Sequence, residues 1–339
     1  MPEEVRSLKS YFSVKNLLSF FLGLVLLFWL LNQVDFKDLF EYLFKINSGY
    51  LLLGGVIYLC KAAIRAWRLN RLNRNLGTYG SMLKLTLASS LASQLLPFKL
   101  GEFVYVYLLR RDKQRSLLQG LSSLMLARVF DLLLIAILFI AISITANVPD
   151  KLSIYFHSVV GFVGILLILL IVLLISARYH QSICDRLEKT KLQAMPLTAK
   201  TLVAIKNVLQ ELGQYHFKDY IEWAGLAGVE WFINYWVYHC LLIGMGLQPD
   251  LFHTVTAVTL AALASVLPIN SFGNFGSQEA GWATGMVLMG YSQATALTTG
   301  LATHFFSLAY ILLLGGISWL SYGILWSKSQ DHLFNGGQM

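Results

Sequence analysis

Three basic side chains in an apolar stretch are the first candidates for chemistry. Arg65 and Arg68 lie in the apolar run 50–69, and with Lys61 they fall at positions i, i+4 and i+7, on one face of a helix. Ionisable groups at membrane depth cost about 2.5–3.5 kcal/mol each on insertion scales, so they call for a function or a partner. An aligned basic face suits a phosphate, because arginine offers a forked pair of donors. The alternative is that Arg65 and Arg68 extend to the cytoplasmic interface.

Acidic side chains accompany the basic ones. Arg128 and Asp131 stand three residues apart in the stretch 117–146, close enough to pair on one helix face. This spacing suits either an ion pair that fixes helix packing or direct substrate contact. Glu102 and Glu279 each follow a break containing proline and glycine. Such carboxylates could take up a proton, bind a cation or pair with an arginine, or they could cap the helix that follows.

The remaining polar residues in apolar stretches carry weaker signals. Glu230 lies in 221–245 among tryptophans and tyrosines, which usually mark an interface or helix packing. His239 and His304 have no partner at ligand spacing, and we interpret them as packed or hydrogen-bonded histidines. The sequence contains no GxSxG, HExxH, P-loop or paired-aspartate motif. It therefore predicts no catalytic residues, no metal site and no cofactor, and we do not expect an enzyme.

The two breaks resemble each other. Residues 91–102 read LASQLLPFKLGE and residues 263–279 read LASVLPINSFGNFGSQE, so each carries Leu-Ala-Ser, a proline, glycine and a glutamate. Proline removes a backbone hydrogen bond and glycine loosens a helix, which predicts a hairpin that enters the membrane and turns back. Interrupted segments at corresponding positions of two halves indicate a transporter-like binding site. The candidate substrate-binding residues are Arg65, Arg68, Pro97, Gly101, Glu102, Arg128, Asp131, Pro268, Gly273, Gly276 and Glu279.

Composition sets the class of protein. The 339 residues are 56% hydrophobic and only 13% charged, with a mean hydropathy of +0.62, which excludes an ordinary soluble globule. The net charge of +8 comes without a nucleic-acid module, so we expect no nucleic-acid partner. Basic residues in loops beside apolar helices instead set membrane orientation. The sequence predicts an all-α polytopic membrane protein.

About 20 apolar residues are needed to span a bilayer. Six stretches meet this standard: 17–34, 50–69, 117–146, 158–177, 221–245 and 303–326. The arms of the two hairpins are shorter: 81–96 and 103–109 around Pro97, and 253–267 and 280–290 around Pro268. We therefore expect six full spans and two re-entrant hairpins. The alternative is that the hairpin arms also span, which gives eight or more crossings.

The distribution of charge supports this topology. With cytoplasmic termini and hairpins that return to their side of entry, most of the 26 lysines and arginines lie in cytoplasmic segments, and only Lys37, Lys45 and Lys151 lie outside. The chain 1–339 is then one transmembrane domain, an inverted repeat of halves 50–146 and 221–326, unless the two similar breaks are a coincidence.

A polar segment, 178–220, connects the two halves. Leu202, Ile205, Leu209 and Leu212 recur within it at helical spacing, which predicts an amphipathic linker on the cytoplasmic leaflet. Binding of anionic headgroups by this linker is a second interpretation.

Four motifs carry a family resemblance: RAWR at 65–68, LPFKLGE at 96–102, ARVFD at 127–131 and LPINSFGNFGSQE at 267–279. With them the chain resembles the flippase-like family built on the lysylphosphatidylglycerol synthase transmembrane region, over nearly its whole length. In the best-understood relatives this region is fused to a soluble aminoacyltransferase domain and is implicated in moving aminoacylated phospholipid across the bilayer. Only 13 residues follow 303–326, so the resemblance implies the translocation part without the synthase part.

We therefore expect a multi-pass protein of the bacterial inner membrane that moves, or binds for movement, an amphiphile with an anionic or glycosylated headgroup. Its expected partner is a membrane lipid, either an anionic phospholipid or a polyprenyl-linked one. The alternative is a membrane-embedded transferase, or a subunit that presents a lipid to a separate glycosyl- or aminoacyl-transferase. A transporter of small solutes that uses the same hairpins is a third hypothesis.

Overall fold

The computed structural model describes residues 32–34, 36–96, 100–145, 215–266 and 275–335, with a few single positions elsewhere. The expected span 158–177 and most of 17–34 and of the linker 178–220 lie outside these residues, as do Pro97, Pro268 and Gly273.

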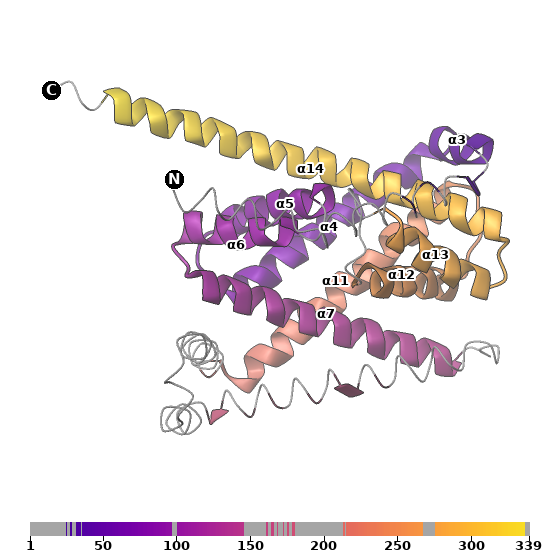
Figure 1. Ribbon diagram of the computed structural model, residues 1–339, viewed down its shortest axis with the longest axis horizontal. Coiled ribbons are helices and arrows are strands. Elements are labelled where there is room, and N and C mark those ends of the chain that lie inside the picture. The colour runs from indigo at the N-terminus through magenta and orange to yellow at the C-terminus, as the bar shows by residue number, and fades with distance from the viewer. Residues whose placement is uncertain are drawn as a thin grey trace. The chain divides into compact units, whose positions relative to one another are not determined.

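The described part of the chain is helical, with nine helices and no strand (Figure 1), which confirms the all-α prediction. The helices are α3 (Phe36–Phe44), α4 (Ser48–Leu72), α5 (Tyr79–Leu95), α6 (Leu100–Lys113), α7 (Leu117–Thr145), α11 (Phe217–Gly244), α12 (Leu251–Val266), α13 (Ser277–Leu288) and α14 (Gln293–Asn335).

Three of the described helices are long and apolar enough to cross a membrane: Ser48–Leu72 in α4, Leu117–Leu138 in α7 and Gln293–Tyr322 in α14. Helix α11, with 28 residues, is long enough but does not join this group. Polar side chains such as Glu230 and Asn234 lower its hydropathy. Helix α14 begins ten residues before the expected start at 303.

Two compact units divide the chain. The first comprises Met1–Ala66, Thr78–Tyr105 and Ile233–Met339, and the second comprises Trp67–Gly77 and Val106–Phe232. Helices α4, α6 and α11 contribute residues to both units, and both predicted hairpins begin in the first. The division into repeat halves stays a prediction.

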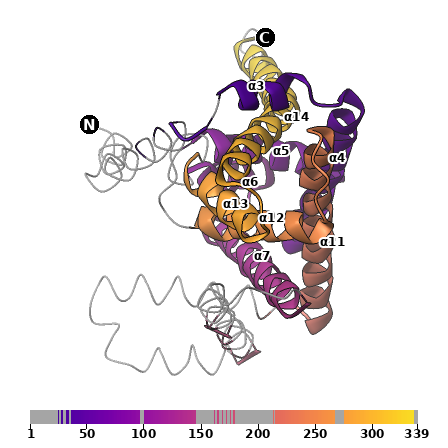
Figure 2. The same ribbon diagram turned by 90° about the vertical axis from the view of Figure 1, so that its right-hand side faces the viewer.

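The predicted hairpin arms form separate short helices, and α5, α12 and α13 lie in the first unit while α6 is shared between the two units. Helices α12 and α13 lie side by side (Figure 2). A Cβ atom on Gly285 would come within 2.5 Å of the Ala257 Cα atom, and one on Gly281 would collide with the Leu260 carbonyl oxygen. In the other hairpin, a Cβ atom on Gly101 would collide with the backbone of Ser93. Glycine is therefore required where these helices approach each other.

Helix α14 packs against both hairpins. A Cβ atom on Gly300 would lie 2.9 Å from the Trp282 ring of α13, and one on Gly315 would lie 2.7 Å from Leu91 Cβ of α5. Near Gly315, Trp319 Nε1 donates a hydrogen bond of 2.9 Å to the Ala88 carbonyl of α5. One helix thus supports both hairpins.

In the second unit, the end of α4 is tied to the beginning of α11. The Arg71 guanidinium forms two hydrogen bonds with the Glu222 carboxylate, of 2.6 and 2.8 Å. The Tyr215 hydroxyl donates to the Leu72 carbonyl over 2.9 Å, and its ring meets the Trp223 ring edge-on at 4.7 Å between centroids. These contacts fix the two helices that carry the buried charges described next.

Candidate functional site

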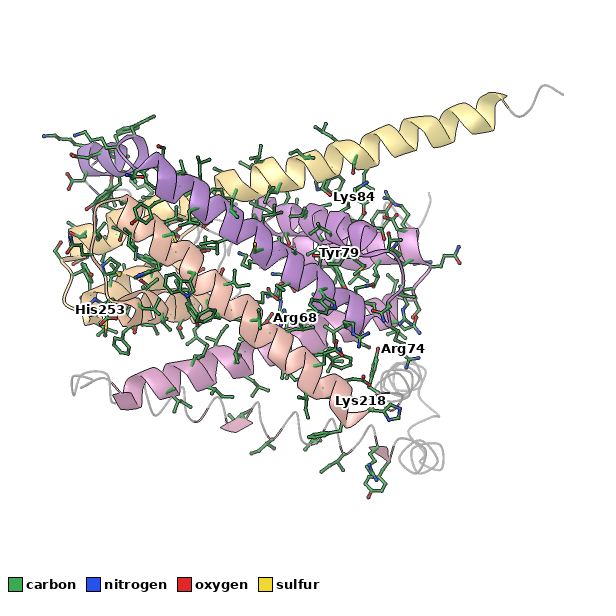
Figure 3. All side chains as sticks on the ribbon, turned by 180° about the vertical axis from the view of Figure 1, so that it is seen from behind. Arg68, Arg74, Tyr79, Lys84, Lys218 and His253 are labelled. Atoms are coloured by element: carbon green, nitrogen blue, oxygen red, sulfur yellow. The ribbon has the colours of Figure 1, made fainter. Side chains whose placement is uncertain are left out.

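The second unit contains a buried ionic cluster, the arginine cluster, formed by Arg68, Asp131 and Glu230. Its members come from α4, α7 and α11 and are 1%, 6% and 6% exposed. Arg68 NH1 donates to Asp131 Oδ1 over 2.6 Å, and Arg68 NH2 lies 3.0 Å from Glu230 Oε2. Trp231 Nε1 also donates to Asp131 Oδ1, over 3.2 Å. Figure 3 labels Arg68 where α4 and α11 run side by side.

The arginine cluster ties three helices together by charge. Arginine does not lose its proton in proteins, and its planar fork suits carboxylates. Hydrogen bonds between charged groups are short and about twice as strong as neutral ones, and breaking such a buried set leaves an uncompensated charge. Both NH groups of Arg68 face carboxylates. Arg68 is thus buried, with both NH groups against carboxylates, and its role in binding a substrate stays a prediction.

The basic face of α4 continues into the first unit. Lys61 is half-buried; its Nζ donates to Asn234 Oδ1 over 3.2 Å and lies 4.0 Å from the centre of the Tyr58 ring. Arg65, one turn further on, is also half-buried and lies within electrostatic reach of Tyr58. The Lys61 contacts with Asn234 and Tyr58 are contacts with neutral groups, whereas Arg68 contacts carboxylates.

A second buried ionic group, the glutamate–histidine pair, lies in the first unit. Glu279 is 1% exposed and His304 is 0% exposed. Glu279 Oε1 contacts His304 Nδ1, and Glu279 Oε2 accepts a hydrogen bond of 2.7 Å from the Gly276 N–H. Gly276 has a φ of 105°, in the region that favours glycine, and it is the N-cap of α13. The predicted capping role of Glu279 is confirmed, and its other oxygen faces a histidine.

Aromatic and hydroxyl groups surround the pair. The Phe275 ring lies 4.4 Å from the His304 ring, centre to centre, at an interplanar angle of 31°. The Tyr238 hydroxyl forms a hydrogen bond with Ser307, one turn of α14 beyond His304. The Tyr238 and Trp282 rings are 5.6 Å apart. The pair therefore lies inside a closely packed set of α11, α13 and α14.

Some of the other predicted site residues lie in the described helices, and the rest lie outside the described residues. Arg128 is half-buried in α7, Gly101 is buried at the close approach of α5 and α6, and Glu102 is half-buried in the first turn of α6. Asp131 contacts Arg68 and Trp231, and its pairing with Arg128 stays a prediction. Pro97, Pro268 and Gly273 lie outside the described residues.

Sequence reasoning missed three partners. His304, Glu230 and Asn234 each contact a charged group that the sequence singled out. Glu230 was recognised as an acid in an apolar stretch, which was the available signal for it. No motif links His304 to Glu279 or Asn234 to Lys61. Within the described ranges, no group of three or more His, Cys, Asp or Glu residues could hold a metal ion.

The long apolar helices and buried ion pairs define the chain as an all-helical membrane protein. Comparison with models of protein families matches residues 16–315 to the lysylphosphatidylglycerol synthase TM region. The match covers most of the chain, which therefore belongs to this family; the resemblance of its four motifs is confirmed. No curated protein and no solved structure matches the chain.

Proposed function

We propose that this protein moves a lipid with an anionic headgroup, of phosphate type or glycosylated, across the bacterial inner membrane. The observation that carries the proposal is the basic face of α4. This helix is long and apolar enough to span a membrane, yet it carries Lys61 and Arg65 half-buried on the same face as Arg68. A phosphate at this face would offset the cost of placing those cations at membrane depth.

The opposite face of α4 suits contact with lipid chains. Leu52, Val56 and Leu59 follow one another at helical spacing and are 72%, 59% and 42% exposed. The helix is therefore apolar outside and polar inside, which is the arrangement expected when hydrocarbon chains stay in the bilayer and the headgroup passes through a protected interior.

The contacts of the basic residues suggest a division of roles. Lys61 contacts the Asn234 amide oxygen and the Tyr58 ring, and a phosphate oxygen could replace the amide oxygen. Arg68 would have to give up two buried carboxylates to do the same. In this proposal, Lys61 and Arg65 contact the headgroup and Arg68 with Asp131 holds the helices in place. Arg128 remains a further candidate contact.

The two hairpins supply the moving parts in this proposal. Each includes two short helices on either side of a break in the sequence pattern, and one helix of each, α5 and α13, packs against α14 within the first unit. Broken helices near the middle of the membrane are a recurring way to build a site that opens to either side. Gly101 and Glu102 in one hairpin, and Gly276 and Glu279 in the other, lie at the helix beginnings next to the breaks.

The test is transbilayer movement of labelled lipids in proteoliposomes. The panel comprises an anionic phospholipid, an aminoacylated phospholipid, a polyprenyl phosphate and a zwitterionic phospholipid. We expect the wild type to accelerate one anionic class and Arg65→Gln to slow it about tenfold, which corresponds to about 1.4 kcal/mol. Lys61→Gln should act in the same direction. The matched control is Arg110→Gln, on an exposed position of α6.

Two results would contradict the proposal. One is that folded wild-type protein accelerates none of these lipids. The other is that lipid recovered from an assay with an activated donor has changed mass, since translocation leaves the lipid intact and a transferase does not. Equal loss in Arg65→Gln and Arg110→Gln would remove the basic face of α4 from the mechanism.

A further inference from the structure

The glutamate–histidine pair has features that its capping role does not explain. Glu279 and His304 are essentially inaccessible, and each side chain is fixed by its neighbours. One carboxylate oxygen accepts from the Gly276 N–H and the other contacts His304 Nδ1. A helix cap alone requires only the first contact. The second places a titratable imidazole against a titratable carboxylate inside the protein.

The described groups that contact the pair carry no fixed charge. Tyr238 of α11 is the titratable side chain within electrostatic reach of Glu279, and its hydroxyl is bonded to Ser307. Phe275 covers one face of the His304 ring. Among the residues that the structure describes, no lysine or arginine forms a salt bridge with Glu279. On α12, the residues that approach Gly281, half a turn beyond Glu279, are Leu260, Ala261 and Ala264.

Counting protons shows what this environment permits. With one transferable proton the pair is neutral, either as carboxylate with imidazolium or as carboxylic acid with imidazole. Without that proton the pair carries one net negative charge, next to the Gly276 N–H at the beginning of α13. Burial disfavours the state with net charge.

His304 Nε2 is the atom from which the proton can leave. Nδ1 faces Glu279, whereas Nε2 is buried and has no hydrogen-bond partner among the described residues. Buried polar atoms in native proteins are nearly always hydrogen-bonded, so this atom calls for a partner, for which water or a headgroup oxygen is suitable. In the imidazolium it is a donor, and in neutral imidazole with the proton on Nδ1 it is an acceptor.

We propose that Glu279 and His304 form a binding site for one proton, which enters and leaves through His304 Nε2. On release, the N–H bond at Nε2 breaks, its electron pair stays on the nitrogen, and the proton passes to water or to a headgroup oxygen. The pair then holds a net negative charge at the beginning of α13. Since Glu279 also binds the Gly276 N–H, the proton changes the charge on the group that fixes this hairpin helix. The coupling of that change to lipid movement rests on the proposed function; proton binding does not.

The direct test follows the histidine nitrogens by ¹⁵N nuclear magnetic resonance. The full chain, labelled at its seven histidines, is placed in lipid nanodiscs and titrated over the pH range in which it stays folded. The His304 signals are assigned by their loss in His304→Gln. We expect Nε2 to change between its protonated and unprotonated shifts, and Glu279→Gln to move the midpoint by about one pH unit, a tenfold change in proton affinity.

The matched control is His239→Gln. His239 is also buried, but its Nδ1 lies 3.0 Å from a hydroxyl, Thr254 Oγ1, instead of a carboxylate. This substitution should leave the His304 midpoint unchanged. A His304 ring that keeps one protonation state throughout the titration, or a midpoint that Glu279→Gln does not move, would overturn the proton site.

A transport experiment distinguishes the proton site from the proposed function. In proteoliposomes with an imposed pH gradient, the wild type should move lipid faster than without the gradient, and His304→Gln should lose this stimulation while His239→Gln keeps it. If His304 titrates as expected but no lipid moves, the proposed function fails and the proton site stands. If lipid moves at a rate that the gradient does not alter, the coupling is wrong and translocation stands.

Discussion

The two buried ionic groups differ in the kind of cation that each contains. In the arginine cluster, one guanidinium faces two carboxylates from different helices. In the glutamate–histidine pair, one imidazole faces one carboxylate that also caps a helix. Arginine keeps its charge at every pH at which a protein folds, whereas histidine can lose it. The arginine cluster therefore holds its helices together by a permanent charge, whereas the charge of the glutamate–histidine pair can change.

This contrast suggests how the chain combines strength with movement. A group that must hold three helices together is best built from a cation that cannot discharge. A group that responds to a proton must be neutral in one state and charged in the other. The protein places the two kinds of group in different compact units. The following predictions test whether this separation is real, from the largest expected effect to the smallest.

Replacing Arg68 should abolish the ionic contacts of the arginine cluster. Arg68→Met leaves Asp131 and Glu230 buried without their guanidinium, and we expect the free energy of unfolding to fall by about 3–5 kcal/mol. The measurement is unfolding in mixed micelles titrated with sodium dodecyl sulfate. Adding Asp131→Asn and Glu230→Gln to Arg68→Met should restore much of the loss, because no unpaired charge then remains. If the triple variant is no more stable than the single one, charge compensation is not what the cluster provides.

The glutamate–histidine pair should instead depend on the close approach of two helices. Gly285→Ala would bring a methyl group within 2.5 Å of the Ala257 Cα atom, so α13 must move away from α12. We expect a loss of about 1–3 kcal/mol and an altered His304 ¹⁵N spectrum, because Glu279 moves with α13.

The control for this prediction is Gly225→Ala in α11, where nothing lies within 4 Å of the added methyl group. This change should be neutral or slightly stabilising, since alanine favours helix more than glycine does. An unchanged His304 spectrum in a folded Gly285→Ala variant would mean that the hairpin does not position the pair.

An exposed ion pair gives the reference for both buried groups. Lys45 Nζ donates to Glu41 Oε1 over 2.9 Å on the surface of α3, and this hydrogen bond lowers the pKa of Glu41 below its ordinary value of 4.5. A lowered pKa adds stability above the ordinary pKa, and that contribution disappears as the pH falls through the lowered value. Lys45→Ala should return the Glu41 pKa towards 4.5, as followed by carbon NMR of the carboxyl, with no measurable change in unfolding at neutral pH.

The sequence predicted which segments are helical and where they break. The apolar runs 50–69 and 117–146 correspond to α4 and α7, and 253–267 corresponds to α12. Capping by Glu279 was one of the alternatives that the sequence offered, because the glutamate follows the break with proline and glycine, and the structure shows this cap. Helix positions and helix caps depend on residues that are close together in the sequence, so the sequence pattern can predict them.

The partners of the buried charges could not be predicted in the same way. Arg68 and Asp131 are 63 residues apart, and Lys61 and Asn234 are 173 apart. Helical spacing assigns a side chain to a face, but the element opposite that face is decided by tertiary packing. Asp131 illustrates the difficulty, since its spacing suggested a partner three residues away on α7, and its contact with Arg68 of α4 could not be read from that spacing.

The beginning of α14 was missed for a local physical reason. Its first turns contain threonines that lower the hydropathy, so the predicted helix began at 303. In the structure the Thr298, Thr299 and Thr303 hydroxyls each donate to a carbonyl one turn earlier, over 2.8 to 2.9 Å. A hydroxyl bonded to its own helix presents little polarity to its surroundings. A hydropathy scale that assigns one value to each residue type does not account for these hydrogen bonds within the helix.

The contacts of α14 with both hairpins have a mechanical consequence. Gly300 meets α13 and Gly315 meets α5, fifteen residues apart, or about 22 Å along the axis of a continuous helix. A helix transmits torque and axial displacement with little loss over that length. Any rotation of α14 that changes its packing against one hairpin must therefore also change its packing against the other.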